Sequence, residues 1–414
     1  MNNDSSKGLK INNPWLPVGL LWVVALLNYL DRQMLSTMRP SMQVDIRELE
    51  SITTFGHLLA VFLWVYGLCS PVAGLVADRF NRKRLIVGSL FVWSTVTLLM
   101  GFATNFNQLY ILRALMGVSE AIYIPASMAL IADFHTGKTR SLANGIHLTG
   151  FYIGQALGGF GATVAHKYSW QETFFGFGLF GILYALLLSV FLKEARVSNK
   201  QVAGLEVVPR PPFFKAIPQL FTNFSFVIIL IYFAVPGIPI WVIKNWLPTI
   251  FSENLKLDMS VAGPIATITL SFSALFGVIL GGYLTDRWSK LNPNARKYVS
   301  AIGMFITIPA FLLIIVGNTL VISILSAIFI GFGLGWYDVN NMPLLCQFVP
   351  SSQRSSAYGL MNMSGVLLGA AATSLFGGIG ADNLINAFVF FGAIILVVTL
   401  TQLYFLRPKT LDFK

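Results

Sequence analysis

The sequence has few cysteine, histidine and charged residues for its length. Among 414 residues only Cys69 and Cys346 are cysteines, and only four residues are histidines. Two cysteines within apolar stretches exclude a disulfide framework and a thiolate metal site. The histidines lack the spacing of metal ligands, so we expect no bound metal. Charged residues make up 11% of the chain, compared with about 25% in soluble globular proteins. The charges are too few to cover a water-exposed surface, which excludes a soluble enzyme.

Long uncharged runs occupy most of the chain instead. They cover residues 11–30, 51–77, 85–112, 141–166, 173–192, 216–243, 259–285, 298–337, 355–381 and 383–406. A helix needs roughly 20 apolar residues to cross a bilayer. The run 85–112 breaks at Thr104 and continues into another helix that reaches about Asp133, and the run 298–337 breaks at Gly317. The sequence therefore predicts an all-α integral membrane protein with twelve transmembrane helices.

The net charge of +11 is explained by topology. Most of the 28 lysines and arginines fall on the side of the N-terminus. The predicted opposite side holds Arg39, Arg47, Lys167, Lys244 and Lys256. Because basic loops stay in the cytoplasm, we expect both termini to be cytoplasmic. We expect the protein itself to lie in the inner (cell) membrane of a bacterium. The charge pattern gives no reason to expect a nucleic-acid partner.

Two motifs recur in the same order in the two halves of the chain. Gly74-Leu-Val-Ala-Asp78-Arg79 recurs as Gly282-Tyr-Leu-Thr-Asp286-Arg287, and Arg140-Ser-Leu-Ala-Asn-Gly145 recurs as Arg354-Ser-Ser-Ala-Tyr-Gly359. We therefore predict an N-terminal six-helix bundle over 1–192, a cytoplasmic linker over 193–217 and a C-terminal six-helix bundle over 218–414. Parallel six-helix repeats are typical of alternating-access carriers that bind their substrate between the halves, near the midplane.

Several motifs resemble those of a known family. Gly74-x-x-x-Asp78-Arg79-x-Asn81-Arg82-Lys83 is similar to the signature loop of the major facilitator superfamily, with Asn81 where glycine is usual. Within that superfamily, Asn28-Tyr29-Leu30-Asp31-Arg32, Arg113-x-x-x-Gly117-x-x-Glu120-x-x-x-x-Pro125 and Trp246-Leu-Pro-Thr249 resemble the anion:cation symporter family. That family carries hexuronates, aldonates, sialic acid and related organic anions, in bacteria mostly with protons. The resemblance implies the major facilitator fold, with Asp31 and Glu120 as proton-carrying carboxylates. It implies a proton as coupling ion, and we expect no cofactor.

Five charged residues lie within predicted spans, namely Asp31, Arg32, Arg113, Glu120 and Asp338. A charge at the bilayer centre costs about 2.5–3.5 kcal/mol on insertion scales, so such residues usually face the protein interior and mark a pathway. The planar fork of Arg32 matches a carboxylate, and we predict that it binds the substrate anion. In an alternative interpretation, Asp31 with Arg113 and Glu120 with Arg32 are purely structural pairs.

Other polar residues are candidates for lining the cavity. Lys244 is either a second cation on the opposite wall or an interfacial lysine that reaches outward. Tyr29 and Tyr66 could bind sugar hydroxyls or belong to the core, and the polar residues of the second half could form a hydrogen-bond cluster between helices. The predicted substrate-binding set is Arg32, Tyr29, Tyr66, Arg113, Gln155, Lys244, Asp338, Asn341 and Asn362.

The two signature loops predict a conformational latch at the cytoplasmic side. In this hypothesis Asp78 pairs with neighbouring helix ends in one state and releases them in the other, and Arg140 and Asp133 are candidate partners. The alternative is that the arginines only set the topology. The residues of the predicted latch are Gly74, Asp78, Arg79, Arg82, Asp133, Arg140, Asp286 and Arg287.

The function favoured by the sequence is proton-coupled import of a sugar-acid type organic anion by alternating access. The expected partners are that small anion and the lipid bilayer, and we expect a monomer. Organophosphate/phosphate antiport is the nearest alternative, because Arg32 and Lys244 could bind a phosphate group. A neutral-solute facilitator is a weaker alternative. A membrane-embedded enzyme would need a His/Asp or metal cluster near the interface, which the sequence does not provide, so no enzymatic activity is expected.

Overall fold

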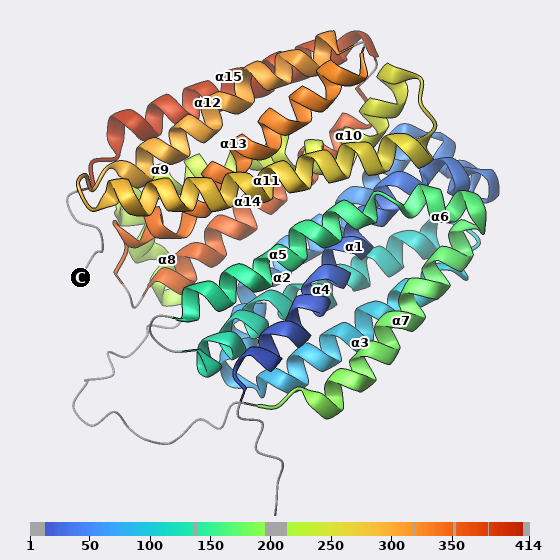
Figure 1. Cartoon of the computed structure of the whole chain (residues 1–414), viewed down its shortest axis with the longest axis horizontal. Helices are drawn as coiled ribbons and strands as arrows, with labels where there is room; N and C mark the ends of the chain where they lie inside the picture. The colour runs from blue at the N-terminus through green and yellow to red at the C-terminus, as the bar shows by residue number, and fades with distance from the viewer. Residues whose placement is uncertain are drawn as a thin grey trace, which may run out of the picture.

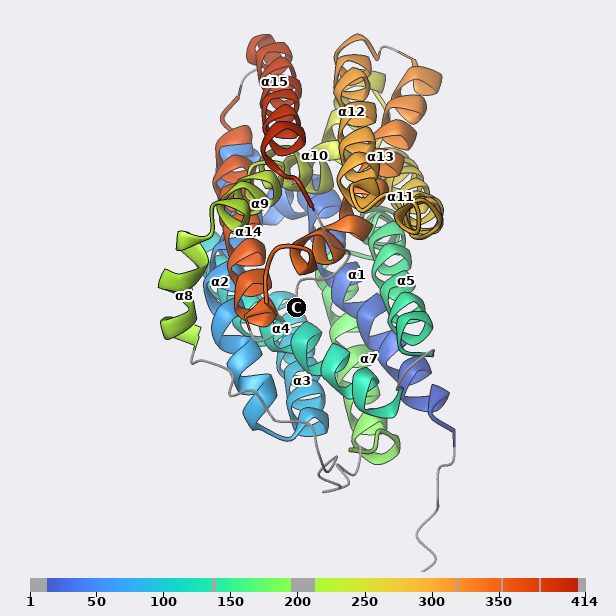
Figure 2. The same ribbon diagram turned by 90° about the vertical axis from the view of Figure 1, so that its left-hand side faces the viewer.

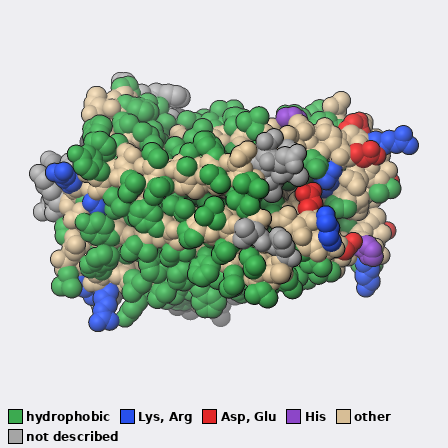
Figure 3. Space-filling view, turned by 90° about the horizontal axis from the view of Figure 1, so that it is seen from above, with side chains coloured by type: hydrophobic (Ala, Val, Ile, Leu, Met, Phe, Trp, Pro, Cys, Tyr) green, Lys and Arg blue, Asp and Glu red, His purple; other side chains and the backbone are tan. Residues whose placement is uncertain are grey.

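The computed structural model describes residues 13–135, 139–194, 213–317, 319–350, 353–379 and 381–408. The described residues form α-helices and contain no strand. Long helices run side by side in two groups, one from each half of the chain (Figure 1). Hydrophobic side chains cover the middle of the molecule, and charged side chains gather toward its two ends (Figure 3). This distribution matches a surface that faces lipid in the middle and water at both ends.

The first half begins with long α1 and continues through α7. Its helices are α1 (Trp15–Asp45), α2 (Ile52–Arg79), α3 (Arg82–Met100), α4 (Phe106–Phe134), α5 (Arg140–Gly158), the short α6 (Gly161–Lys167) and α7 (Trp170–Phe191), with the 3-10 turn η1 (Arg47–Glu50). The second half contains α8 (Phe213–Thr222), α9 (Phe224–Ala234), α10 (Gly237–Leu255), α11 (Met259–Ser289), α12 (Ala295–Val316), α13 (Leu320–Cys346), α14 (Arg354–Phe376) and α15 (Ala381–Phe405).

Ten segments of the described chain are long and apolar enough to cross a membrane, and α9 with α10 count as one of them, Phe224–Leu255. The polar helices α1 and α5 bring the number of crossings to twelve. The predicted fold class, an all-α membrane protein with two six-helix bundles, is therefore confirmed. The bundle boundaries and the linker stay a prediction, because residues 195–212 lie outside the described part.

Three predicted spans differ from the observed helices. α1 continues beyond Leu30 to Asp45, and α10 carries the seventh span beyond Ile243 to Leu255. Lys244 therefore lies inside a membrane-spanning helix, and its assignment to the outer side was wrong. Both predicted ends were placed at a charged residue, but these charges belong to the helices and face the protein interior. The fifth span is broken at Gly159 and Phe160, between α5 and α6.

The two halves repeat the same packing. In the first half α1 packs on α5, α2 on α4, and α3 on both α4 and α7. The corresponding pairs in the second half are α10 with α14, α11 with α13, and α12 with both α13 and α15. Each pair in one half has an equivalent in the other, as expected from the sequence repeat. Figure 2 shows the two halves from the end at which α1 begins.

The glycines of α5 explain how closely it packs on α1. A Cβ atom at Gly150 would lie 2.7 Å from the carbonyl oxygen of Trp22, and one at Gly158 would lie 2.9 Å from that of Leu30. A Cβ atom at Gly154 would overlap the Leu26 carbonyl. Small residues at this spacing allow the two backbones to touch. They bring polar groups of α1 and α5 to fixed positions beside the interface between the halves.

The halves meet through α2 with α14 and through α5 with α11. We call the end at which α1 begins the inner end and the opposite end the outer end. At the outer end the Thr53 hydroxyl donates to the carbonyl of Gly377 at 3.3 Å, and Nδ1 of His57 lies 2.6 Å from Oγ of Ser374. Thr163 donates to the carbonyl of Ser260 at 2.7 Å. In this structure the outer end is therefore closed.

Candidate substrate and proton site

The central feature of the first half is an ion pair between α1 and α4. Nε of Arg32 donates to Oε2 of Glu120 at 2.6 Å, and the two side chains are 9% and 0% exposed. Both residues lie near the middle of their helices. Hydrogen bonds between ionised groups are among the strongest in proteins, and burial strengthens them further. One of the two structural pairs considered from the sequence, Glu120 with Arg32, is thus formed.

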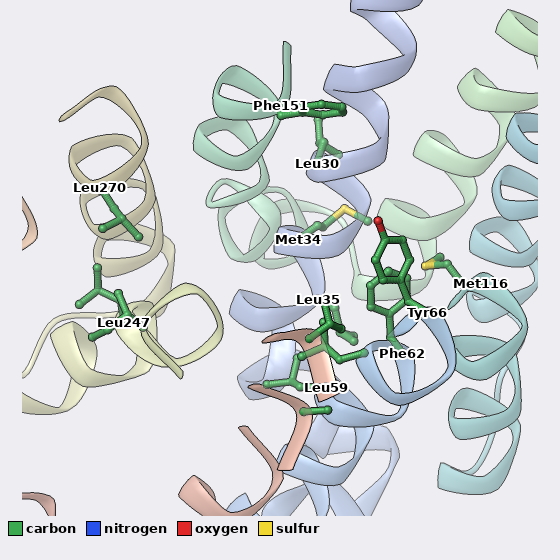
Figure 4. Close-up of a cluster of buried hydrophobic side chains, with 14 of the residues drawn as sticks. Leu30, Met34, Leu35, Leu59, Phe62, Tyr66, Met116, Phe151, Leu247 and Leu270 are labelled. Carbon is green, nitrogen blue, oxygen red and sulfur yellow. The ribbon is translucent and has the colours of Figure 1, made fainter. Parts of the chain in front are cut away.

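Three aromatic rings surround the Arg32 guanidinium group. Its Cζ atom lies 4.9 Å from the ring centre of Tyr29, 4.8 Å from that of Phe62 and 4.6 Å from that of Tyr66. Phe62 and Tyr66 stack with ring centres 5.7 Å apart, and Figure 4 shows them side by side near Met116. Aromatic faces attract a cation, most strongly where water is excluded. The rings hold the guanidinium in place and leave polar recognition to its N–H groups.

Asp31 and Arg113 are buried close to this pair without joining it. Oδ2 of Asp31 accepts a hydrogen bond from Thr97 at 3.4 Å, and Arg113 donates to the sulfur of Met116 at 3.2 Å. The Cζ atom of Arg113 also lies 4.9 Å from the centre of the Phe62 ring, which is one of the three rings around Arg32. Asp31 and Arg113 attract each other electrostatically. No direct ion pair joins them in the described structure, so the second structural pair considered from the sequence is absent in this state.

Many polar atoms in this cluster lack a partner from the protein. They are Oδ1 and Nδ2 of Asn28, Oδ1 of Asp31, Nη2 of Arg32, Nε of Arg113 and Oε1 of Glu120. Buried polar groups normally have hydrogen-bond partners, since leaving one without a partner costs roughly 1–3 kcal/mol. The cluster therefore has a built-in capacity to bind a proton or a polar ligand.

The second half contributes a smaller charged pair. Lys244 on α10 is half-buried, with Nζ 5.3 Å from the ring centre of Trp241. It attracts Asp338 on α13 electrostatically. Asp338 is exposed, and its Oδ1 accepts a hydrogen bond from Asn341 at 3.4 Å. Lys244 is also close enough to Arg32 for the two cations to repel each other. Two cations therefore face the same region from opposite halves.

The structure brings most of the predicted substrate-binding residues into this region. Tyr29 interacts electrostatically with Asp338 across the interface. Asn362 on α14 donates to Ser70 on α2 at 3.4 Å, so it ties the halves together in this state. Gln155 is buried one turn after Phe151, whose ring centre lies 4.8 Å from that of Tyr29. Tyr66 covers Arg32, which limits the contact of its ring with any ligand.

Sequence reasoning missed several residues of the site. Asn28 and Phe62 could have been found, because each lies one helical turn from a predicted residue, Arg32 and Tyr66 respectively. Tyr123 and His147 could not. The Tyr123 hydroxyl donates to the carbonyl of Leu21 at 2.8 Å and lies 2.8 Å from Nε2 of His147. This fully buried group links α1, α4 and α5.

Part of the predicted latch is visible at the inner end. Arg82 at the start of α3 forms an ion pair with Asp133 near the end of α4. The Glu194 carboxylate accepts hydrogen bonds from the backbone N–H groups of Arg82 at 3.2 Å and of Lys83 at 2.7 Å. This cap of α3 was not expected from the sequence. It fastens the residues after α7 to the signature loop.

Among the other latch residues, those whose side chains the structure describes form no hydrogen bond or ion pair with the opposite half. The side chains of Asp78, Arg79 and Arg140 lie outside the described part of the structure. A side chain at Gly74 would meet no atom within 4 Å. Asp286 and Arg287 are exposed, and Arg287 donates to the hydroxyl of Tyr283 at 3.3 Å. The latch therefore stays a prediction.

Two repeated six-helix bundles with buried charges at their interface define a multi-pass membrane transporter rather than an enzyme. The chain belongs to the major facilitator superfamily, whose family model matches residues 21–365 and 238–412. The superfamily assignment made from the signature loop is thus confirmed.

Comparisons with individual proteins point to more than one branch of the superfamily. Protein spinster homolog 1 of Xenopus laevis is 27% identical over 405 residues, which cover 91% of this chain and 74% of that protein. The probable galactarate/D-glucarate transporter GudP of Bacillus subtilis (strain 168) is 26% identical over 442 residues, which cover 97% of this chain and 93% of that protein. The second relative is named as a sugar-acid transporter, in agreement with the resemblance to anion:cation symporters.

A solved structure has the same fold. It is a crystal structure of a bacterial homolog of the human lysosomal transporter Spinster in an inward-facing, unoccupied conformation. It matches this chain with a TM-score of 0.75 at 18% identity and covers 94% of this chain and 95% of that one. At this level of identity the likeness concerns the fold alone.

Proposed function

We propose that this protein is a proton-coupled symporter that imports an organic anion of the sugar-acid type by alternating access. The observation that carries the proposal is the buried Arg32–Glu120 ion pair inside an aromatic cage. Arg32 is suited to bind a carboxylate, yet in this structure it is bound by a carboxylate of the protein itself. Substrate and Glu120 therefore compete for one guanidinium group.

This competition couples the substrate to a proton. Breaking a buried ion pair without replacing one partner costs about 3–5 kcal/mol. Protonation of Glu120 without substrate would leave Arg32 without a counter-ion, and substrate binding without protonation would place two carboxylates at one cation. Only the joint arrival of a proton and an anion keeps the charge balanced. Asp31, buried beside Arg113, is the second candidate proton carrier in the first half.

The proposed cycle follows from this balance. At the open outer end Glu120 takes up a proton and releases Arg32, which binds the substrate carboxylate. The halves then close at the outer end and open at the inner end. Substrate leaves, Glu120 loses its proton to the inner solution, and the Arg32–Glu120 pair forms again. The present structure, with this pair formed and the outer end closed, fits the last step.

Polar groups around Arg32 would recognise the remainder of the substrate. Tyr29 is half-buried beside the guanidinium and can bind a sugar hydroxyl. Lys244, Asn341 and Gln155 are placed to interact with more distant groups. A relative named as a galactarate/D-glucarate transporter supports a polyhydroxylated acid as substrate. We further propose a monomer in the bacterial inner membrane. The distribution of basic residues supports a cytoplasmic position of both termini.

Organophosphate/phosphate antiport is the alternative function, favoured by the two cations Arg32 and Lys244 on facing walls. Uptake into proteoliposomes distinguishes the two functions. Labelled uronates, aldonates, sialic acid and a sugar phosphate are supplied with and without an inward proton gradient. We expect one of the sugar acids to accumulate only with the gradient. Gradient-independent exchange of a sugar phosphate for internal phosphate would overturn the proposal and favour antiport.

A further inference from the structure

Asp338 has an unusual environment for an acidic residue in a membrane span. It lies on α13, within the apolar segment Leu320–Cys346, yet its side chain is exposed. Lipid would be a very costly environment for a carboxylate. Apart from Tyr337 and Asn341 on α13 itself, the groups that interact with Asp338 belong to α1, α5, α10 and α14, so its exposed surface is directed between the halves rather than toward lipid.

The titratable groups facing Asp338 come from both halves. They are Tyr29 on α1, Tyr152 on α5, Lys244 on α10, Tyr337 on α13 itself and Tyr358 on α14. Among these groups, which all belong to the described part of the chain, Lys244 is the one cation. Asp338 is therefore held at the interface of the halves, opposite the Arg32 cage, with Lys244 as its counter-ion.

Lys244 and Asp338 in the second half combine the same two kinds of group as Arg32 and Glu120 in the first half, although in the described structure they attract each other without a direct ion pair. Each pair combines a cation that could bind an anionic substrate with a carboxylate that neutralises it when the site is empty. Lys244 is held against the Trp241 ring, much as Arg32 is held by its aromatic cage. While Asp338 is ionised, an incoming anion meets a pair with no net charge. Protonation of Asp338 would leave Lys244 free to attract it.

We propose that Asp338 is an additional proton carrier, which binds a proton when Lys244 engages the substrate and releases it at the inner end. The proton comes from the outer solution, forms an O–H bond on the Asp338 carboxylate and passes to water at the inner end after the halves have rocked. This inference rests on the proposed symport and adds to it that each wall of the cavity carries a proton.

Charge balance within the membrane supports this role. The membrane-spanning middle of the described helices holds the acids Asp31, Glu120 and Asp338 and the bases Arg32, Arg113 and Lys244. These charges cancel, so an added anion is tolerated only with added protons. If all protons bound in the first half, a substrate group near Lys244 would still meet the ionised Asp338.

The test is the number of protons transported per substrate, measured from static-head accumulation in proteoliposomes at clamped membrane potential. At a fixed pH difference of about one unit, each coupled proton raises accumulation about tenfold. We expect Asp338→Asn to remove one proton and lower accumulation about tenfold, with downhill exchange retained. Glu172→Gln, which changes an exposed acid in the first turn of α7, is the matched control and should leave the ratio unchanged.

A second variant keeps the inference testable if Asp338→Asn is not inserted into the membrane. Lys244→Gln leaves Asp338 without its counter-ion, so Asp338 should stay protonated throughout the cycle, and the ratio should again fall by one proton. An unchanged ratio in either variant would overturn the role of Asp338 and leave the symport intact. Wild-type uptake that does not depend on the proton gradient would instead overturn the proposed function itself.

Discussion

Arg32 contacts Glu120 through its Nε atom, at 2.6 Å, and Nη2 of the same guanidinium has no partner from the protein. Glu120 therefore uses only part of the hydrogen-bonding capacity of the guanidinium group. Its remaining N–H groups lie inside a ring of aromatic faces, where a carboxylate could bind with little competition from water. This geometry lets one arginine respond to both proton and substrate.

Replacing Glu120 by Gln should separate proton coupling from substrate binding. The amide cannot carry a proton through the cycle, so at a pH difference of about one unit we expect gradient-driven accumulation to fall about tenfold, which corresponds to one coupled proton. Exchange of labelled for unlabelled substrate should persist, because Arg32 remains available. Both are measured in proteoliposomes, with Glu172→Gln as control. Accumulation by Glu120→Gln equal to that of the wild-type protein would contradict the proposed role.

Replacing Arg32 by Lys should weaken substrate binding while preserving the charge. Lysine lacks the planar fork and the stacking surface of arginine, and a hydrogen bond to a charged group is worth about 1.5–3 kcal/mol. We therefore expect the substrate Kd, measured by calorimetry, to rise about tenfold or more. Arg47→Lys, which changes an exposed arginine of η1, is the matched control. Equal losses in the two variants would show that Arg32 has no special role in binding.

Gly159 should control closure of the outer end. A Cβ atom at Gly159 would lie 2.8 Å from the carbonyl oxygen of Gly263 on α11 and would overlap the side chain of Thr267. Overpacking of this kind costs typically about 1–3 kcal/mol, and here the cost falls on the state in which α5 and α11 touch. We expect Gly159→Ala to shift the population toward the outward-open state.

The shift is measured by labelling Ser374→Cys with an impermeant maleimide, in a background where Cys69 and Cys346 are replaced by Ser. Labelling should be several-fold faster with Gly159→Ala. Gly145→Ala is the matched control on the same helix, because a Cβ atom there would meet nothing within 4 Å. Unchanged labelling in the Gly159 variant would argue against tight contact at this point.

Arg82 and Asp133 should contribute to transport only through the ion pair that they form with each other. Its side chains are 24% and 25% exposed, and such partly exposed pairs contribute at most about 1 kcal/mol to stability. We expect Arg82→Ala and Asp133→Ala to lower transport to a similar extent, and the double variant to be no worse than either, with small changes in Tm. Additive losses would show that the two residues act independently.

The latch hypothesis has its own test in Asp78. Asp78→Asn should slow transport if Asp78 binds neighbouring helix ends in only one state of the cycle. Unchanged transport, with an unchanged amount of protein in the membrane, would refute the latch and leave the arginines of this loop with a role in topology only.

The charged site could be predicted in part because burial of charge is costly. Asp31, Arg32, Arg113 and Glu120 stand out in any apolar segment, and the structure places them in one cluster. The sequence suggested Glu120 with Arg32 as a pair, but it could not show that Asp31 and Arg113 form no ion pair, because this depends on the rotation of α1 and α4 about their axes. Tyr123 was missed because one aromatic residue in an apolar helix resembles any other until its neighbours are known.

The sequence alone determined the number and order of the membrane-spanning helices. A sufficiently long uncharged run is stable across a bilayer however the helices pack against one another. The tertiary structure decided where spans 1 and 7 end, because only the observed helices show that α1 continues past Arg32 and that Lys244 lies within α10 rather than in a loop. It also decided that Glu120 neutralises Arg32 while Asp338 faces Lys244. Such pairings depend on distances of a few ångströms between residues far apart in the chain, which no local pattern encodes.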